Sequence, residues 1–163
     1  MTATPSPPSS SNIQELAQAI AVATVDDRLL LELAPAQWEA LAPYLQTLAL
    51  ATDQVLFKQG AADRTLYLIE SGSLSVHCED EQGEVRLAIV GPGSAVGEGS
   101  FFSRGLRSAT VQAGVPTRLW YLSPVRFDAL TRQRPDLALA VSMAAGAVVA
   151  RRLLNARRRN AVT

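Results

Sequence analysis

This 163-residue sequence lacks several features that would point to familiar classes of protein. It has one cysteine, so no disulfide can form within the chain, which agrees with a reducing compartment. It has one histidine, whereas zinc and related metal enzymes draw on several histidines together with a carboxylate. Fifteen basic residues balance fifteen acidic ones, so the net charge favours neither a nucleic acid nor an anionic membrane as partner. We therefore expect a cytoplasmic protein without a metal ion.

The sequence also shows no signal for a targeting segment or a membrane-spanning segment. The N-terminus, MTATPSPPSSSN, has no basic region followed by an apolar stretch, so it is not a secretory signal. The longest nearly uncharged apolar run, Leu137 to Ala150, is shorter than the ~18–20 residues that a spanning helix needs. The sequence therefore predicts no membrane association.

No catalytic motif stands out in the remaining residues. The sequence shows no nucleophile with a neighbouring base, no Walker-type phosphate loop and no paired carboxylates in a suitable setting. The single histidine, His77, falls on the outer face of its strand by alternation with Leu74, Val76 and Cys78. We therefore expect no catalytic residue and no cofactor, and the protein is not predicted to be an enzyme.

Composition divides the chain into three parts. Residues 1–11 are almost entirely Pro, Ser and Thr, so ordering them has no compensation from burial, and they are predicted to form a disordered tail. Residues 12–154 have the apolar content and length of one globular domain, and residues 155–163 form a basic C-terminal tail.

Helical patterns occupy both ends of the domain. Apolar residues at helical spacing follow Asn12, which can cap a short helix, and Pro35 opens a second one. Pro135 starts a long helix from about Asp136 to about Arg158, whose centre is rich in small residues. The small residues lie four apart and would let two such helices approach closely: Ser142, Gly146 and Ala150, and likewise Ala140 and Ala144.

The middle of the domain, residues 53–122, has the sequence pattern of an all-β fold, with short apolar runs separated by turn residues. The predicted fold class is therefore mainly β with flanking helices. The expected strands are the runs VLFKQG, TLYLIESG, SLSVHCED, EVRLAIV and TRLWYLSP.

One segment, VGEGSFFSRGLRSATV, carries the groups that a sugar phosphate requires. Gly97 lets the backbone approach closely, and Glu98 offers a carboxylate to a hydroxyl. A short helical turn over residues 100–103 presents backbone N–H groups. Arg107, which we expect to begin the next strand, offers a planar fork to phosphate oxygens, and Ser108 adds a hydroxyl.

This segment, residues 96–111, resembles the phosphate-binding cassette of the cyclic-nucleotide-binding family, and we call it the cassette. The match is Gly97-Glu98 followed by Arg107-Ser108-Ala109 at a spacing that the family uses. The resemblance implies that Glu98 binds the ribose 2′-hydroxyl and that Arg107 binds the cyclic phosphate. The predicted ligand-binding set is Gly97, Glu98, Gly99, Ser100, Arg107, Ser108 and Ala109.

The resemblance covers roughly residues 33–154, with Gly60 and Gly72 at the family's habitual turns. It implies a β-roll, a jelly-roll-like double-stranded β-helix, with N-terminal helices and a long C-terminal helix. Gly99 departs from the pattern, since the family usually has Leu or Met there to pack against the hinge helix. Cyclic AMP is favoured over cyclic GMP, although the Ser108 hydroxyl also suits a guanine base.

The function that the resemblance implies is cyclic nucleotide sensing. Ligand binding would reposition the C-terminal helix and change a homodimer interface or a protein-partner interface. Too few residues follow Arg157 for a helix-turn-helix domain, so we expect no DNA binding. The C-terminal arginines are interpreted as a solvated helix end; they are Arg151, Arg152, Arg157, Arg158 and Arg159.

Two alternatives stay open at this point. In the first, Glu98 and Arg107 form only an intramolecular ion pair, and the chain is a degenerate, non-binding family member that serves as an interaction or dimerisation module. In the second, the chain is the regulatory fragment of a larger transcription factor, channel or transporter.

Overall fold

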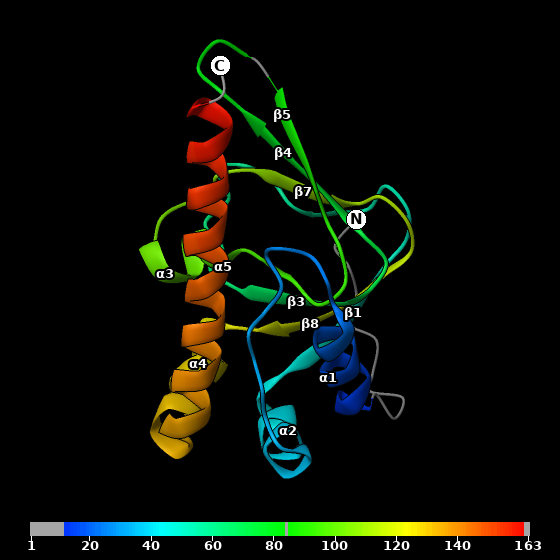
Figure 1. Ribbon diagram of the computed structural model, residues 1–163, viewed down its shortest axis with the longest axis vertical. Helices are drawn as coiled ribbons and strands as arrows, with labels where there is room; N and C mark the ends of the chain where they lie inside the picture. The colour runs from blue at the N-terminus through cyan, green and yellow to red at the C-terminus, as the bar shows by residue number, and fades with distance from the viewer. Residues whose placement is uncertain (1–11, 84, 162–163) are drawn as a thin grey trace.

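The computed structural model describes residues 12–83 and 85–161 (Figure 1). The predicted disordered tail, residues 1–11, lies outside the described residues. The helices are α1 (Ile13–Val22), α2 (Pro35–Leu41) with a 3-10 turn after it (Ala42–Tyr44), α3 (Glu98–Ser103), α4 (Pro124–Gln133) and α5 (Pro135–Ala161). The strands are β1 (Gln46–Leu50), β2 (Val55–Phe57), β3 (Leu66–Ser71), β4 (Leu74–Glu79), β5 (Val85–Val90), β6 (Ala95–Val96), β7 (Thr110–Ala113) and β8 (Thr117–Leu122).

The strands form two antiparallel four-stranded sheets, in the orders β1-β8-β3-β6 and β2-β7-β4-β5. Alternation along each strand sends one set of apolar side chains between the sheets, where they form a core cluster. The predicted β-roll with a C-terminal helix is confirmed. The inner cluster consists of Leu48, Leu50, Phe57, Ile69, Leu74, Val90, Val96, Val111, Ala113 and Leu119.

A second core cluster lies on the other face of the β1-β8-β3-β6 sheet. Leu66, Leu68 and Trp120 point from the sheet into this cluster, and helices α1, α2, α4 and α5 cover it. Figure 1 shows α5 running along most of the length of the molecule at the left, with α1 and α2 at the lower right. Helices and sheet therefore share one apolar layer, which fixes α5 beside the cassette.

Helix α5 is apolar on two faces. One face, with Leu137, Val141, Ala144 and Val148, is almost fully buried. Ala144 therefore belongs to the domain core, whereas the predicted small-residue seam had placed it with Ala140 on a surface for another helix. The opposite face exposes Leu139, Met143, Leu153 and Leu154.

The helix also runs on into the predicted basic tail, as far as Ala161. Its segment Pro135–Arg158 is long and apolar enough to cross a membrane by length and composition alone, a test that core helices of soluble proteins also pass. In this fold that segment has one face packed against the domain core.

The strand pattern of the sequence is largely confirmed, but β1 and β6 were not predicted. β6 has two residues, so no periodicity marks it. The strand expected to begin at Arg107 begins at Thr110, and the helical turn expected from Ser100 already begins at Glu98. Six loop residues of the cassette, 104–109, therefore precede the strand, and Arg107 lies in this irregular segment.

The turn between β5 and β6 contacts helix α1 at a glycine. Gly93 has φ 83°, and a Cβ built on it would lie 2.4 Å from the Ala23 Cβ and 2.8 Å from the Ala19 carbonyl oxygen. The backbone of Gly93 also pairs with Ile69 and Leu29. Only glycine fits this position, which ties the N-terminal helix to the sheet.

We expect Gly93→Ala to lower the free energy of unfolding by about 2–4 kcal/mol, from left-handed backbone strain and the overlap with α1. Gly91→Ala in the same turn is the matched control, because its Cβ would meet no atom within 4 Å. It should change stability by less than about 0.5 kcal/mol. Urea denaturation of both variants measures the difference, and equal stabilities would contradict this account.

Candidate ligand-binding site

A cavity of about 100 Å³ lies between the cassette and the inner faces of the strands. All seven residues of the predicted ligand-binding set line it. The structure thus brings together residues from both ends of the cassette. The lining residues that the sequence did not indicate are Phe57, Val76, Val96, Val111 and Arg152.

Gly97 shapes the start of the cassette. It adopts φ 84°, and a Cβ built on it would lie 2.5 Å from the Arg107 Nη1 atom and 2.6 Å from the Thr65 carbonyl oxygen. Its own carbonyl oxygen accepts a hydrogen bond from Arg107 at 3.1 Å. The absence of a side chain at this position therefore makes room for the arginine.

The Arg107 side chain is held from four directions although it belongs to a loop. Its Nη1 atom donates to Gly97 and to the Ser100 hydroxyl, at 3.1 and 2.6 Å. Its Nη2 atom donates to the Asp63 carboxylate and, at 2.8 Å, to the Thr65 carbonyl oxygen. The residue is only 3% exposed, so these contacts fix the guanidinium inside the protein.

The remaining guanidinium nitrogen of Arg107 is Nε, which is buried and, within the described part of the chain, makes no hydrogen bond. The Phe57 ring covers one face of the group, with its centroid 4.0 Å from Cζ. A buried donor without an acceptor costs about 1–3 kcal/mol, so an oxygen placed in this cavity would relieve that cost.

Asp63 keeps Arg107 in place electrostatically. Burial alone would raise the pKa of this carboxyl group, but hydrogen bonds from Arg107 and Thr65 outweigh burial and hold the pKa below its ordinary value. Asp63 is therefore ionised at neutral pH and already balances the charge of Arg107. An anion in the cavity would be recognised by the direction of the donors more than by net charge.

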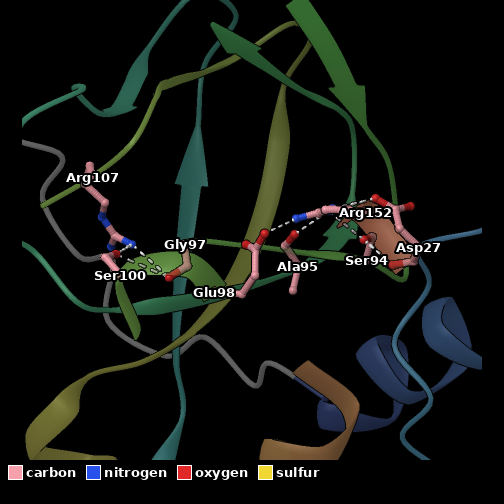
Figure 2. Close-up of polar contacts among 8 residues, drawn as sticks. All are labelled: Asp27, Ser94, Ala95, Gly97, Glu98, Ser100, Arg107 and Arg152. Carbon is pink, nitrogen blue, oxygen red and sulfur yellow. Dashed lines mark hydrogen bonds and ion pairs between the residues drawn. The ribbon is translucent and has the colours of Figure 1, made fainter. Parts of the chain in front are cut away.

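Glu98 is bound to the C-terminal helix (Figure 2). Its Oε1 atom accepts from Arg152 Nη1 at 2.5 Å. The same guanidinium donates to Asp27 Oδ2 from Nε and Nη2, at 2.9 and 2.8 Å. Nη2 also reaches the Ala95 carbonyl oxygen at 2.8 Å and the Ser94 hydroxyl at 3.2 Å. Arg152 thus connects α5, the loop after α1 and the cassette.

The Arg152 charge is stable in this setting. Burial would lower the pKa of the guanidinium, but the carboxylates of Glu98 and Asp27 outweigh burial and raise it above the ordinary value. Glu98 and Arg107 do not pair with each other, so the ion pair considered from the sequence is wrong: each side chain has a different partner.

The described residues do not add a metal centre to this arrangement. Among residues 12–83 and 85–161, no group of three or more His, Cys, Asp or Glu side chains is placed to hold a metal ion. The chemistry that the cassette offers in the cavity is hydrogen bonding and charge pairing.

A family model for the cyclic nucleotide-binding domain matches residues 47–134, from β1 through α4, and so includes the whole cassette. The chain belongs to the cyclic nucleotide-binding domain family. The match covers both sheets, and this domain accounts for most of the described fold.

The relatives agree with this membership. The Cyclic AMP receptor protein of Thermus thermophilus is 34% identical over 125 residues, which is 76% of this chain and 56% of that protein. The chain therefore spans little more than half of that relative's length.

Solved structures show the same architecture. A cyclic nucleotide-binding domain from Methylobacillus flagellatus superposes with a TM-score of 0.79 over 90% of this chain and 81% of its own, at 23% identity, which shows the fold alone. A cAMP-binding acyltransferase from Mycobacterium smegmatis gives a TM-score of 0.55 at 28% identity, over 74% of this chain and 37% of its own.

We expect Gly97→Ala to weaken cyclic AMP binding by about tenfold or more, because the new methyl group would displace the Arg107 guanidinium. Gly91→Ala, in the turn between β5 and β6 and outside the cavity lining, is the control, since a Cβ there meets no atom within 4 Å. It should bind like the wild type. Isothermal titration calorimetry compares the two, and equal losses would show that Gly97 has no special part in placing Arg107.

Proposed function

We propose that this domain is a cyclic nucleotide sensor, with cyclic AMP as the favoured ligand, and that its role is regulatory and not catalytic. The observation that carries the proposal is the buried Nε atom of Arg107, which has no acceptor among the described residues, in a cavity lined by the whole predicted ligand-binding set. A phosphate oxygen is the acceptor that such a fixed guanidinium fits best.

The other cassette groups have complementary tasks in this proposal. The Ser108 hydroxyl and the backbone at Ala109 complete the surface around the phosphate. Glu98 presents its Oε2 atom, for which the described residues provide no partner, to the ribose 2′-hydroxyl. The Thermus thermophilus relative is a cyclic AMP receptor protein and the Mycobacterium smegmatis acyltransferase is cAMP-binding, which supports this choice of ligand.

Binding requires the cavity to widen. Ligand pockets usually measure about 300–1,000 Å³, well above the 100 Å³ found here. The strands lining the cavity belong to two tightly packed sheets, whereas Arg152 reaches it from helix α5. Widening would therefore displace α5, and ligand capture would be transmitted through the Glu98–Arg152 contact.

The movement of α5 would change the interface of a homodimer that forms through this helix. The positions Leu139, Met143, Gly146, Ala150 and Leu153 lie alternately four and three residues apart, which is the spacing of a coiled-coil seam. Leu139, Met143 and Leu153 are more than half exposed. A second copy would bury them across a two-fold axis, and a protein partner with an apolar helix could do the same.

A second candidate function is that of an interaction module that binds no nucleotide. The small cavity and the engagement of Glu98 by Arg152 favour it. In either case the domain can serve within a larger protein, as the cAMP-binding acyltransferase illustrates.

Calorimetry on three variants tests the proposal. Arg107→Ala should nearly abolish cyclic AMP binding, and Arg107→Lys should retain reduced affinity, because lysine keeps the charge but loses the fork. Glu98→Gln should cost about 1.5–3 kcal/mol, a tenfold to hundredfold loss, by weakening a charge-assisted bond.

A 2′-deoxy cyclic nucleotide provides the control for the Glu98 assignment. It should bind the wild type poorly and be nearly indifferent to Glu98→Gln, since it has no hydroxyl for the carboxylate. Thermal unfolding confirms that each variant is folded. If the wild type binds no cyclic nucleotide, the interaction module is the correct function. If the wild type and Arg107→Ala bind cyclic nucleotides equally, the assignment of Arg107 to the phosphate is wrong.

For the dimer, we expect the wild type to sediment as a dimer at roughly tens of micromolar. Met143→Glu should make it monomeric, because the two-fold axis would bring like charges together. The side chain is 68% exposed, so the protomer should tolerate the change. Met143→Leu, which keeps an apolar residue, is the control. A monomeric wild type would contradict the prediction.

A further inference from the structure

A second, larger groove lies on the far side of Arg152 from the nucleotide cavity. It has a volume of about 570 Å³ and separates the loop after α1, residues 23–28, from the last turns of α5. The helix lines it with side chains spaced three, four and seven residues apart, which lie on one helical face. These are Arg151, Leu154, Asn155 and Arg158.

Three arginines present positive charge at this groove. Arg28 comes from the loop, and Arg151 and Arg158 come from the helix. Arg28 donates to the Ala23 carbonyl oxygen at 3.3 Å, and Arg151 donates to the Asp26 carbonyl oxygen at 2.9 Å. Across the described ranges, none of the three forms an ion pair, in contrast to the neighbouring Arg152.

The groove therefore carries positive charge that its own lining does not neutralise. Asp26 is the one acidic residue in that lining, so the three arginines leave an excess of two positive charges among the described residues. Guanidinium groups match phosphate oxygens through two parallel N–H donors. An anion with two or more linked phosphates offers more oxygen atoms than a single phosphate with which to engage arginines from both walls.

We propose that this groove binds a small polyphosphate. The phosphates lie between Arg28 on the loop and Arg151 and Arg158 on the helix. Val25 and Leu154, which are 41% and 54% exposed, offer apolar surface at the same groove for an organic part such as a nucleoside. The shared chemistry is the phosphate chain, which comes either from an inorganic polyphosphate or from a nucleoside polyphosphate.

The position of the groove connects it with the nucleotide cavity. The loop that carries Arg28 also carries Asp27, and Arg152 holds Asp27 and Glu98 together. A polyphosphate that bridges loop and helix keeps α5 in the position in which Arg152 occupies Glu98. This coupling rests on the proposed nucleotide sensing: bound polyphosphate then weakens cyclic AMP binding, and cyclic AMP weakens polyphosphate binding by the same factor.

The test is calorimetric titration of the full chain with inorganic tripolyphosphate at physiological salt, without any cyclic nucleotide. Arg28→Gln and Arg158→Gln should each weaken binding by about threefold to tenfold, a range suited to charge-assisted bonds at a partly exposed site. Arg157→Gln is the matched control: it removes the same charge from the adjacent position, which does not line the groove. It should weaken binding by less than about twofold.

Parallel titrations with ATP distinguish the sources. If ATP binds more tightly than tripolyphosphate, and the groove variants weaken both to the same extent, the ligand is a nucleoside polyphosphate. If the two affinities are equal, the groove recognises the phosphate chain alone. Absence of tripolyphosphate binding, or equal losses in Arg157→Gln and Arg158→Gln, would overturn the groove as a site. Thermal unfolding verifies that the variants are folded.

A separate titration of cyclic AMP at saturating tripolyphosphate tests the coupling. Weaker cyclic AMP binding supports it, and unchanged affinity would overturn the coupling while leaving the groove intact. Failure of cyclic AMP to bind in the absence of tripolyphosphate would count against the proposed sensing function and not against the groove.

Discussion

The contact of Arg152 with Glu98 and Asp27 is the constraint on which the rest of the site depends. It joins α5 to a loop 125 residues earlier in the chain and to the first residue of α3. A partly buried arginine between two carboxylates is stable only while both partners stay in reach, because an unpaired charge in that place is costly. The positions of the C-terminal helix, the N-terminal loop and the cassette are therefore set together.

The two arginines of the site are paired in different ways. Arg107 is balanced by Asp63 and covered by the Phe57 ring, and all its contacts lie within the β-roll and the cassette. Arg152 is balanced by residues outside its own helix. The first arrangement gives a fixed donor inside the domain, and the second gives a contact that changes if α5 moves. In the proposed function, recognition and transmission therefore depend on separate side chains.

Much of this arrangement could be predicted from the sequence, because the signals were local. The glycines with positive φ, the cap at Asn12, the proline that begins α2 and the order of cassette residues each depend on near neighbours. Arg152 could not be singled out among the C-terminal arginines, since its role depends on the rotation of α5 and on a loop far away in sequence. Asp63 likewise gave no signal, because its partner lies 44 residues further on.

Gly99 has a consequence for how α5 is held. A Cβ built on Gly99 would have no atom within 4 Å, so α3 places no apolar side chain against α5 at this position. Apolar surfaces lose contact gradually as they slide, whereas a forked hydrogen-bonded ion pair weakens steeply once its distances and angles leave a narrow range. In the proposed function, the Arg152 ion pairs therefore favour two discrete helix positions over a continuum and make movement between them sensitive to ionic strength.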